Sequence, residues 1–120
     1  MATALAAEKG GMPDALARIR ASLGANSVIT ERAALAGYVD RGSLLGPDAP
    51  LPAAAVFPEN AEHVRSIVSI ANEFRISVWP LAGSGKFAGS STPAIVLDHK
   101  RMNRILEVNE EFAYALVEPG

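Results

Sequence analysis

The stretch SVWPLAGSGKFAGSS, residues 77–91, joins a short apolar run and a proline to a loop with three glycines. The apolar run is typical of a buried strand. The glycines that follow it allow unusual backbone angles and a close approach of the main chain to a ligand. This stretch therefore predicts a strand that ends in a binding loop, and the segments around it decide the fold.

The residues before the loop predict a strand–helix–strand unit. Residues 53–57 (AAAVF) are typical of a buried strand, and residues 76–80 (ISVWP) of a second one. Between them, Asn60 can cap a helix by accepting a hydrogen bond from an early backbone amide. The apolar stripe of this helix consists of Val64, Ile67, Val68, Ala71 and Phe74. Such a unit has parallel strands and a right-handed crossover.

The residues after the loop predict further strands. Residues 94–98 (AIVLD) indicate a third strand, and residues 104–109 and 114–120 flank a turn at 110–111, as in an antiparallel hairpin. The predicted fold class is α+β (α/β), with an N-terminal helical arm, a βαβ unit and further strands.

The N-terminal arm is predicted to contain two helices. Pro13 and Asp14 suit the first turn of a helix that ends before Gly24. Its apolar face carries Leu16, Ile19 and Leu23. We expect a short strand or turn at 27–30 and a second short helix that is capped by Thr30, runs through Leu35 and is ended by Gly37.

Two domains follow from this pattern, an arm at 1–46 and a main unit at 47–120. The Gly- and Pro-rich segment 41–52 separates them. Residues 1–11 resemble a frayed leader and lack the basic start and long apolar run of a secretory signal.

Composition limits the classes of function. The chain has 120 residues, a net charge of -2 and no cysteine, which excludes disulfides and thiolate chemistry. We expect no nucleic-acid partner and no membrane partner, because both would need a basic or long apolar surface. A cytoplasmic protein is the default interpretation. The two histidines are not at metal-ligand spacing, so no metal site is predicted.

Three phosphate-binding arrangements fit parts of the loop. A Walker A loop would need glycine at Pro80 and Ser or Thr at Phe87. A dinucleotide fingerprint matches Gly83, Gly85 and Ala88 but needs a helix after the loop, and the next strand starts too soon for one. The third arrangement, an anion-binding concavity of backbone amides, needs no helix and fits the spacing best. A surface loop without a ligand remains the alternative.

Two longer segments carry a resemblance to a known family. They are PENAEHVRSIVSIANEFRISVWPLAGSGKF (58–87) and IVLDHKRMNRILEVNEEFAYALVEPG (95–120). Together they resemble the first subdomain of the PCMH-type FAD-binding domain in the vanillyl-alcohol oxidase / p-cresol methylhydroxylase superfamily. The similarity is greatest to phenol-oxidising members of the 4-cresol dehydrogenase and eugenol oxidase type. It extends over residues 52–120, and more loosely over 13–51.

The resemblance implies that the loop binds the diphosphate of FAD and that the EPG turn approaches the same cofactor. Relatives have an arginine near Lys86 and a glycine where this chain has Ala88; alanine would cost about 1 kcal/mol there if its φ angle were positive. The implied cofactor-binding residues are Pro80, Ala82, Gly83, Ser84, Gly85, Lys86, Phe87, Ala88, Gly89, Pro119 and Gly120.

The resemblance also implies a function. The chain would be the FAD-binding segment of a flavin-dependent oxidoreductase. Such an enzyme would oxidise para-substituted phenols by hydride transfer to flavin. No catalytic residue is assigned, because such enzymes have several hundred residues and this chain is similar to their first part. We therefore expect a fragment that is inactive alone and is completed by a missing C-terminal half or a second chain. The alternative is a non-catalytic remnant or an interaction module that needs a partner chain.

The other polar and aromatic candidates have plainer interpretations. His63 is expected on a solvated helix face and His99 in a turn, with Asp98 as the cap of that turn. Trp79 and Phe74 are expected in the core rather than against a ligand. The hairpin glutamates are expected on a solvent face.

Overall fold

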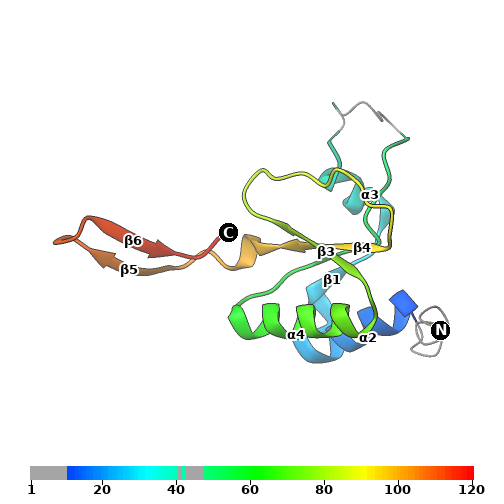
Figure 1. The fold of residues 1–120 in the computed structure, drawn as a ribbon, viewed down its shortest axis with the longest axis horizontal. Helices are drawn as coiled ribbons and strands as arrows, with labels where there is room; N and C mark the ends of the chain where they lie inside the picture. The colour runs from blue at the N-terminus through cyan, green and yellow to red at the C-terminus, as the bar shows by residue number, and fades with distance from the viewer. Residues whose placement is uncertain (1–10, 41, 43–47) are drawn as a thin grey trace.

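The computed structural model describes residues 11–40, 42 and 48–120 (Figure 1). The predicted leader, apart from Gly11, and half of the predicted boundary between arm and main unit (residues 41 and 43–47) lie outside these ranges. The α-helices and strands, in chain order, are α2 (Gly11–Leu23), β1 (Val28–Ile29), α3 (Arg32–Leu35), β2 (Ala54–Val56), α4 (Ala61–Glu73), β3 (Ser77–Leu81), β4 (Ala94–Asp98), β5 (Ile105–Asn109) and β6 (Tyr114–Val117). Short 3₁₀-helices are η1 (Ala25–Ser27), η2 (Ala36–Tyr38) and η4 (His99–Arg101). The predicted α+β class is confirmed.

The main sheet has the strand order β1-β2-β4-β3. Strands β2, β3 and β4 are parallel, and β1 is antiparallel to β2. The predicted strand–helix–strand unit is present as β2, α4 and β3, but β4 lies between its two strands. Residues 94–97 of β4 are all buried, as expected of a central parallel strand with both faces covered. Leu81 pairs with Asp98, so β3 and β4 end side by side.

Helices α2 and α4 lie next to each other on one face of this sheet (Figure 1). Ile19 of α2 and Ile67 of α4 are completely buried there. Burial of such a side chain contributes about 1.5–3 kcal/mol. The core on this face consists of Ala15, Leu16, Ile19, Val28, Ala54, Val56, Ile67, Ile70, Ala71, Ile76, Ile95 and Leu97. The arm and the strand–helix–strand unit thus share one core.

The opposite face is covered by α3, η2 and part of the glycine loop. Phe57, Phe87 and Val96 are almost completely buried in this second core, and Trp79 packs against it. The Trp79 and Phe87 rings meet edge to face, with centroids 5.2 Å apart. The loop therefore contributes Phe87 to this second core, although most of the other loop residues are exposed.

The predicted signals of α4 are confirmed with one exception. The Asn60 side chain accepts a hydrogen bond from the His63 amide at 2.9 Å, so it caps the helix. Val68 was expected in the core but is 48% exposed, whereas Ile70 is buried. The buried residues of α4 are therefore Ile67, Ile70 and Ala71, with Val64 and Phe74 partly buried against the same core.

The arm differs from the prediction in detail. Helix α2 begins at Gly11, two residues before Pro13, and ends before Gly24, whose φ of 109° and ψ of 160° form a conformation that is accessible essentially only to glycine. Thr30 does not cap α3; Glu31 is at that position, and no side-chain bond caps the helix. Helix α3 ends at Leu35, as predicted, and the chain continues into η2, which contains Gly37. In the described ranges, no helix is long and apolar enough to cross a lipid bilayer.

Strands β5 and β6 form the predicted antiparallel hairpin, which extends away from the sheet (Figure 1). The turn between them contains Ala113 in the left-handed region, with φ of 52°. At the base, the Glu118 amide donates to the Arg104 carbonyl at 2.9 Å. The hairpin has few contacts with the rest of the fold, and its apolar side chains are exposed.

Candidate functional site

The glycine loop leaves the sheet at the carboxyl end of β3. This is the edge at which ligands bind in parallel α/β sheets. Pro80 is still within β3, and residues 82–93 form the connection to β4. No helix occurs in this connection, which agrees with the prediction and excludes the dinucleotide fingerprint, since that motif needs a helix start.

The loop turns at its glycines. The Gly85 amide donates to the Ala82 carbonyl at 3.2 Å, closing a tight turn in which Gly83 has a φ of 57°. Gly89 has a φ of 105°, and a Cβ there would lie 3.0 Å from Pro50 Cγ. Ala88 does not have a positive φ angle, so the alanine that replaces a family glycine adds no backbone strain.

The first part of the loop offers hydrogen-bond donors to an anion. Residues 82–86 are exposed. Among the described residues, the amides of Gly83, Ser84, Lys86 and Ala88 donate to no protein acceptor. Residues 82–93 contain no carboxylate, and the glycines leave the backbone accessible. This donor set fits a diphosphate group.

Lys86 and Phe87 attach the loop to η2. The Lys86 Nζ atom donates to the Gly37 carbonyl at 3.0 Å. The Phe87 amide donates to the Tyr38 carbonyl at 2.7 Å, and Phe87 forms an isolated parallel bridge with Val39. The Phe87 side chain is only 2% exposed. These two residues therefore hold the loop against η2.

Tyr38 also contacts the strand next to the loop. Its hydroxyl donates to Asp98 Oδ2 at 2.6 Å, at the end of β4. Burial, the hydrogen bond and the charge of Asp98 raise the pKa of Tyr38 above its usual value. The phenol therefore stays protonated at neutral pH and remains a donor to this carboxylate.

His99 connects the glycine loop to the EPG turn. Its Nδ1 atom is 2.8 Å from the Leu81 carbonyl oxygen, where the loop begins. The Gly120 amide donates to the Met102 carbonyl at 2.7 Å, and a Cβ at Gly120 would overlap the His99 carbonyl oxygen. The start of the glycine loop and Gly120 therefore both lie against the turn at 99–102, which follows β4.

The sequence interpretation of the remaining polar residues is largely confirmed. Asp98 Oδ1 accepts a bond from the Lys100 amide at 3.0 Å, so it caps the turn as predicted. His63 is half-buried, and its Nδ1 atom accepts a bond from the Glu59 amide at 3.3 Å. The contribution of Tyr38 was missed, because its partners are 49 and 60 residues away in sequence and no local motif marks it.

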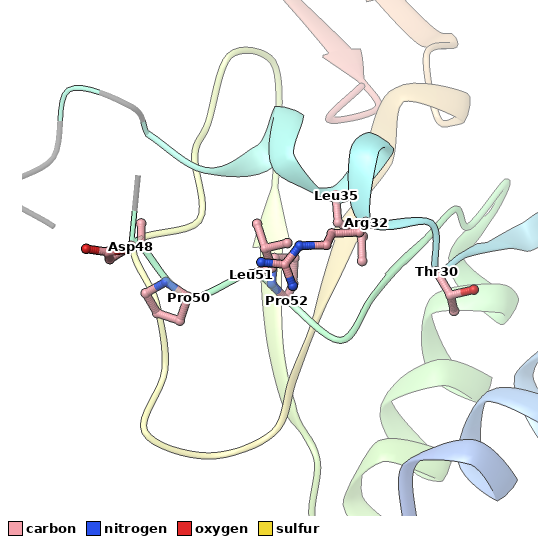
Figure 2. A pocket seen from close by; sticks show the side chains of 8 residues that line it. Thr30, Arg32, Leu35, Asp48, Pro50, Leu51 and Pro52 are labelled. Atoms are coloured by element: carbon pink, nitrogen blue, oxygen red, sulfur yellow. The ribbon is translucent and has the colours of Figure 1, made fainter. Parts of the chain in front are cut away.

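Two surface cavities lie away from this edge. One, of about 540 Å³, is bordered by α3 and residues 48–52, and Figure 2 shows Arg32 among its lining side chains. The other, of about 620 Å³, lies between α2 and α4; its arginines, Arg18 and Arg65, form ion pairs with Glu73 and Glu62. Neither cavity includes a glycine-loop residue. In the described ranges, no cluster of three His, Asp or Glu side chains could hold a metal ion.

Comparison with known proteins identifies relatives with the same fold. The FAD binding domain family matches residues 52–120. The flavoprotein subunit of 4-cresol dehydrogenase [hydroxylating] from Pseudomonas putida is 35% identical over 117 residues, which is 93% of this chain and 22% of that protein. A crystal structure of p-cresol methylhydroxylase with substrate bound has a TM-score of 0.79 at 35% identity and covers 93% of this chain.

A second solved structure agrees with the first. A 4-ethylphenol oxidase from Gulosibacter chungangensis, in an isoeugenol complex, has a TM-score of 0.76 at 29% identity. It covers 92% of this chain and 23% of its own. The chain therefore spans about a quarter or less of the length of these relatives.

Proposed function

The chain belongs to the FAD binding domain family, its cofactor is FAD, and from this premise we propose that the glycine loop binds the diphosphate of that cofactor. The proposed contacts come from the main chain of residues 82–89, with Pro80 before them and Pro119 and Gly120 nearby. The observation that carries the proposal is a set of exposed loop amides at the carboxyl edge of a parallel sheet, for which the described part of the chain offers no acceptor. Bound FAD supplies a hydride acceptor, whereas this chain only holds and orients the cofactor.

We further propose that the protein oxidises para-substituted phenols. The support comes from two relatives, a 4-cresol dehydrogenase and a 4-ethylphenol oxidase, whose substrates are both para-alkylphenols. The test is anaerobic mixing of the purified native flavoprotein with a para-alkylphenol, with the flavin absorbance near 450 nm as the readout. Rapid bleaching supports this substrate class. Bleaching by a 2-hydroxy acid alone would contradict it.

The loop assignment has its own test on the 120-residue chain. We expect weak binding of FAD, so the ¹⁵N-labelled chain is titrated with FAD and followed by NMR. The amide signals of Gly83, Ser84 and Gly85 should shift first, and those of α2 should not. If the largest shifts occurred at the cavity around Arg32, the diphosphate site would be elsewhere.

A second candidate function is that of an interaction module completed by a partner chain. The observation that favours it is the exposed apolar hairpin, in which Ile105 and Val108 are 70% and 67% exposed. Analytical ultracentrifugation of the chain tests this candidate, because an interaction module of this kind should self-associate through the hairpin. A monomer would not support it. The division into an arm at 1–46 and a main unit at 47–120 remains a prediction.

A further inference from the structure

We propose that Tyr38 is a positioning residue for the cofactor loop, an inference that rests on the proposed function of that loop. Tyr38 lies in η2, before the segment that matches the FAD binding domain family. It makes two hydrogen bonds, one through its carbonyl and one through its hydroxyl, to two different segments of the site edge.

The first bond fixes the middle of the glycine loop. The Phe87 amide donates to the Tyr38 carbonyl at 2.7 Å. The residues on either side of Tyr38 add to this attachment: Gly37 accepts from Lys86, and Val39 forms the bridge with Phe87. The buried Phe87 ring then keeps this point of the loop on the sheet. The exposed amides of residues 83–86 are thus held between the end of β3 and a fixed point.

The second bond fixes the turn after β4. The Tyr38 hydroxyl donates to Asp98 Oδ2 at 2.6 Å, while the other carboxylate oxygen, Oδ1, caps η4 through the Lys100 amide. That turn carries His99, whose Nδ1 atom contacts the Leu81 carbonyl at the loop start. These contacts form a closed ring. Tyr38 is bonded to Phe87, the loop leads from Phe87 back to Leu81, Leu81 contacts His99, and the neighbouring Asp98 is bonded to the Tyr38 hydroxyl.

The physical effect of this ring is preorganisation. A loop rich in glycine loses much conformational freedom when it closes on a ligand, and this loss weakens binding. A loop held at both ends in the free protein has already lost part of that freedom. Tyr38 should therefore increase affinity for FAD without contacting it.

The test compares two tyrosines that make the same bond in different places. Tyr38→Phe removes the hydroxyl bond to Asp98, and Tyr114→Phe removes a 2.6 Å bond to Glu107 in the hairpin. Exchange of the Gly85 and Phe87 amides, which are bonded to the Ala82 and Tyr38 carbonyls, should be about tenfold faster without FAD in Tyr38→Phe and unchanged in Tyr114→Phe. The dissociation constant for FAD, from the NMR titration, should rise about fivefold in Tyr38→Phe only.

Further variants separate positioning from general stability. Ile67→Val weakens the core on the far face of the sheet and should leave the FAD dissociation constant unchanged. Asp98→Asn keeps an oxygen acceptor for the Tyr38 hydroxyl and should bind FAD more tightly than Asp98→Ala. Equal loss of affinity in Ile67→Val and Tyr38→Phe would show that Tyr38 acts only through stability.

The failures of the two proposals are distinguishable. Unchanged exchange of the loop amides in Tyr38→Phe, or faster exchange with unchanged affinity, overturns the positioning role. Absence of FAD-induced shifts in the wild-type loop overturns the diphosphate site. In that case the amide-exchange measurement, which is made without FAD, still decides whether Tyr38 orders the loop.

Discussion

The main sheet and the β5–β6 hairpin are both built from apolar strands, but their environments are opposite. Ile95 and Val96 of the sheet are completely buried, whereas Ile105 and Val108 of the hairpin are largely exposed. Helices and the glycine loop cover the sheet on both faces; among the described residues, nothing comparable covers the hairpin. The comparison teaches that an apolar pattern predicts a strand but not what packs against it.

The hairpin nevertheless has two chemically different faces. Cross-strand pairing puts Glu107 opposite Leu116 and Asn109 opposite Tyr114 on one of them. The other carries Val108 with Ala115 and Ile105 with Val117, and it is entirely apolar. A register shift between Ile105 and Glu107 allows this separation. A two-stranded ribbon of this kind is marginally stable alone, so the apolar face is suited to a further layer of protein.

The largest expected difference between the two regions comes from a pair of phenylalanines. Phe57→Ala removes a side chain that is 1% exposed, and it should lower the free energy of unfolding by about 3–5 kcal/mol. Phe112→Ala removes one that is 70% exposed at the hairpin turn, and the change should be within about 0.5 kcal/mol. Urea unfolding followed by Trp79 fluorescence measures both. Equal losses would mean that the hairpin and the sheet unfold as one packed unit.

Local signals in the sequence predicted most of the elements. Strands β2 to β6 and helix α4 follow from apolar periodicity and from a cap at Asn60, which act over a few residues. The position of β4 between β2 and β3 could not be predicted, because periodicity does not specify strand order. Val68 was assigned to the core for a related reason, since apolar spacing alone does not show that Ile70 is buried in its place.

The candidate site was predictable only in part. The loop with Gly83 and Gly85 can be recognised in the sequence, because glycine marks positions where the chain adopts unusual backbone angles. The contacts that hold the loop are not, because Tyr38 and Asp98 are ordinary residues made relevant by long-range pairing. The sequence also does not show that the Lys86 side chain donates to the Gly37 carbonyl or that Phe87 is buried.

A matched pair of asparagines should give the next largest difference. Asn60 caps α4 and Asn109 caps the hairpin turn, and each accepts an amide bond from three residues later at 2.9 Å. Asn60→Ala should reduce global stability by about 1 kcal/mol. Asn109→Ala should speed amide exchange in the hairpin and leave the urea midpoint unchanged. A common shift of the midpoint would contradict the independence of the hairpin.

The smallest effect is expected at the base of the hairpin and depends on pH. The Glu118 carboxylate accepts bonds from the Arg104 amide at 2.9 Å and from its guanidinium at 2.7 and 3.1 Å, and its side chain is 7% exposed. These bonds lower the pKa of Glu118, because they favour the charged form. The stabilisation is therefore complete above the ordinary pKa of glutamate and is lost as the pH falls through the lowered value in the folded state.

Acidification from neutral pH should consequently loosen the hairpin base before it unfolds the sheet. The measurement is the exchange and chemical shift of the Glu118 and Gly120 amides as the pH is lowered, with the Ile95 amide as the reference for the sheet. Glu118→Gln should abolish this pH-dependent loosening, and Glu110→Gln, at the hairpin turn, should retain it. If Glu118→Gln kept the wild-type pH profile, another group would govern the EPG turn, and the ion pair with Arg104 would have no part in placing Gly120 beside His99.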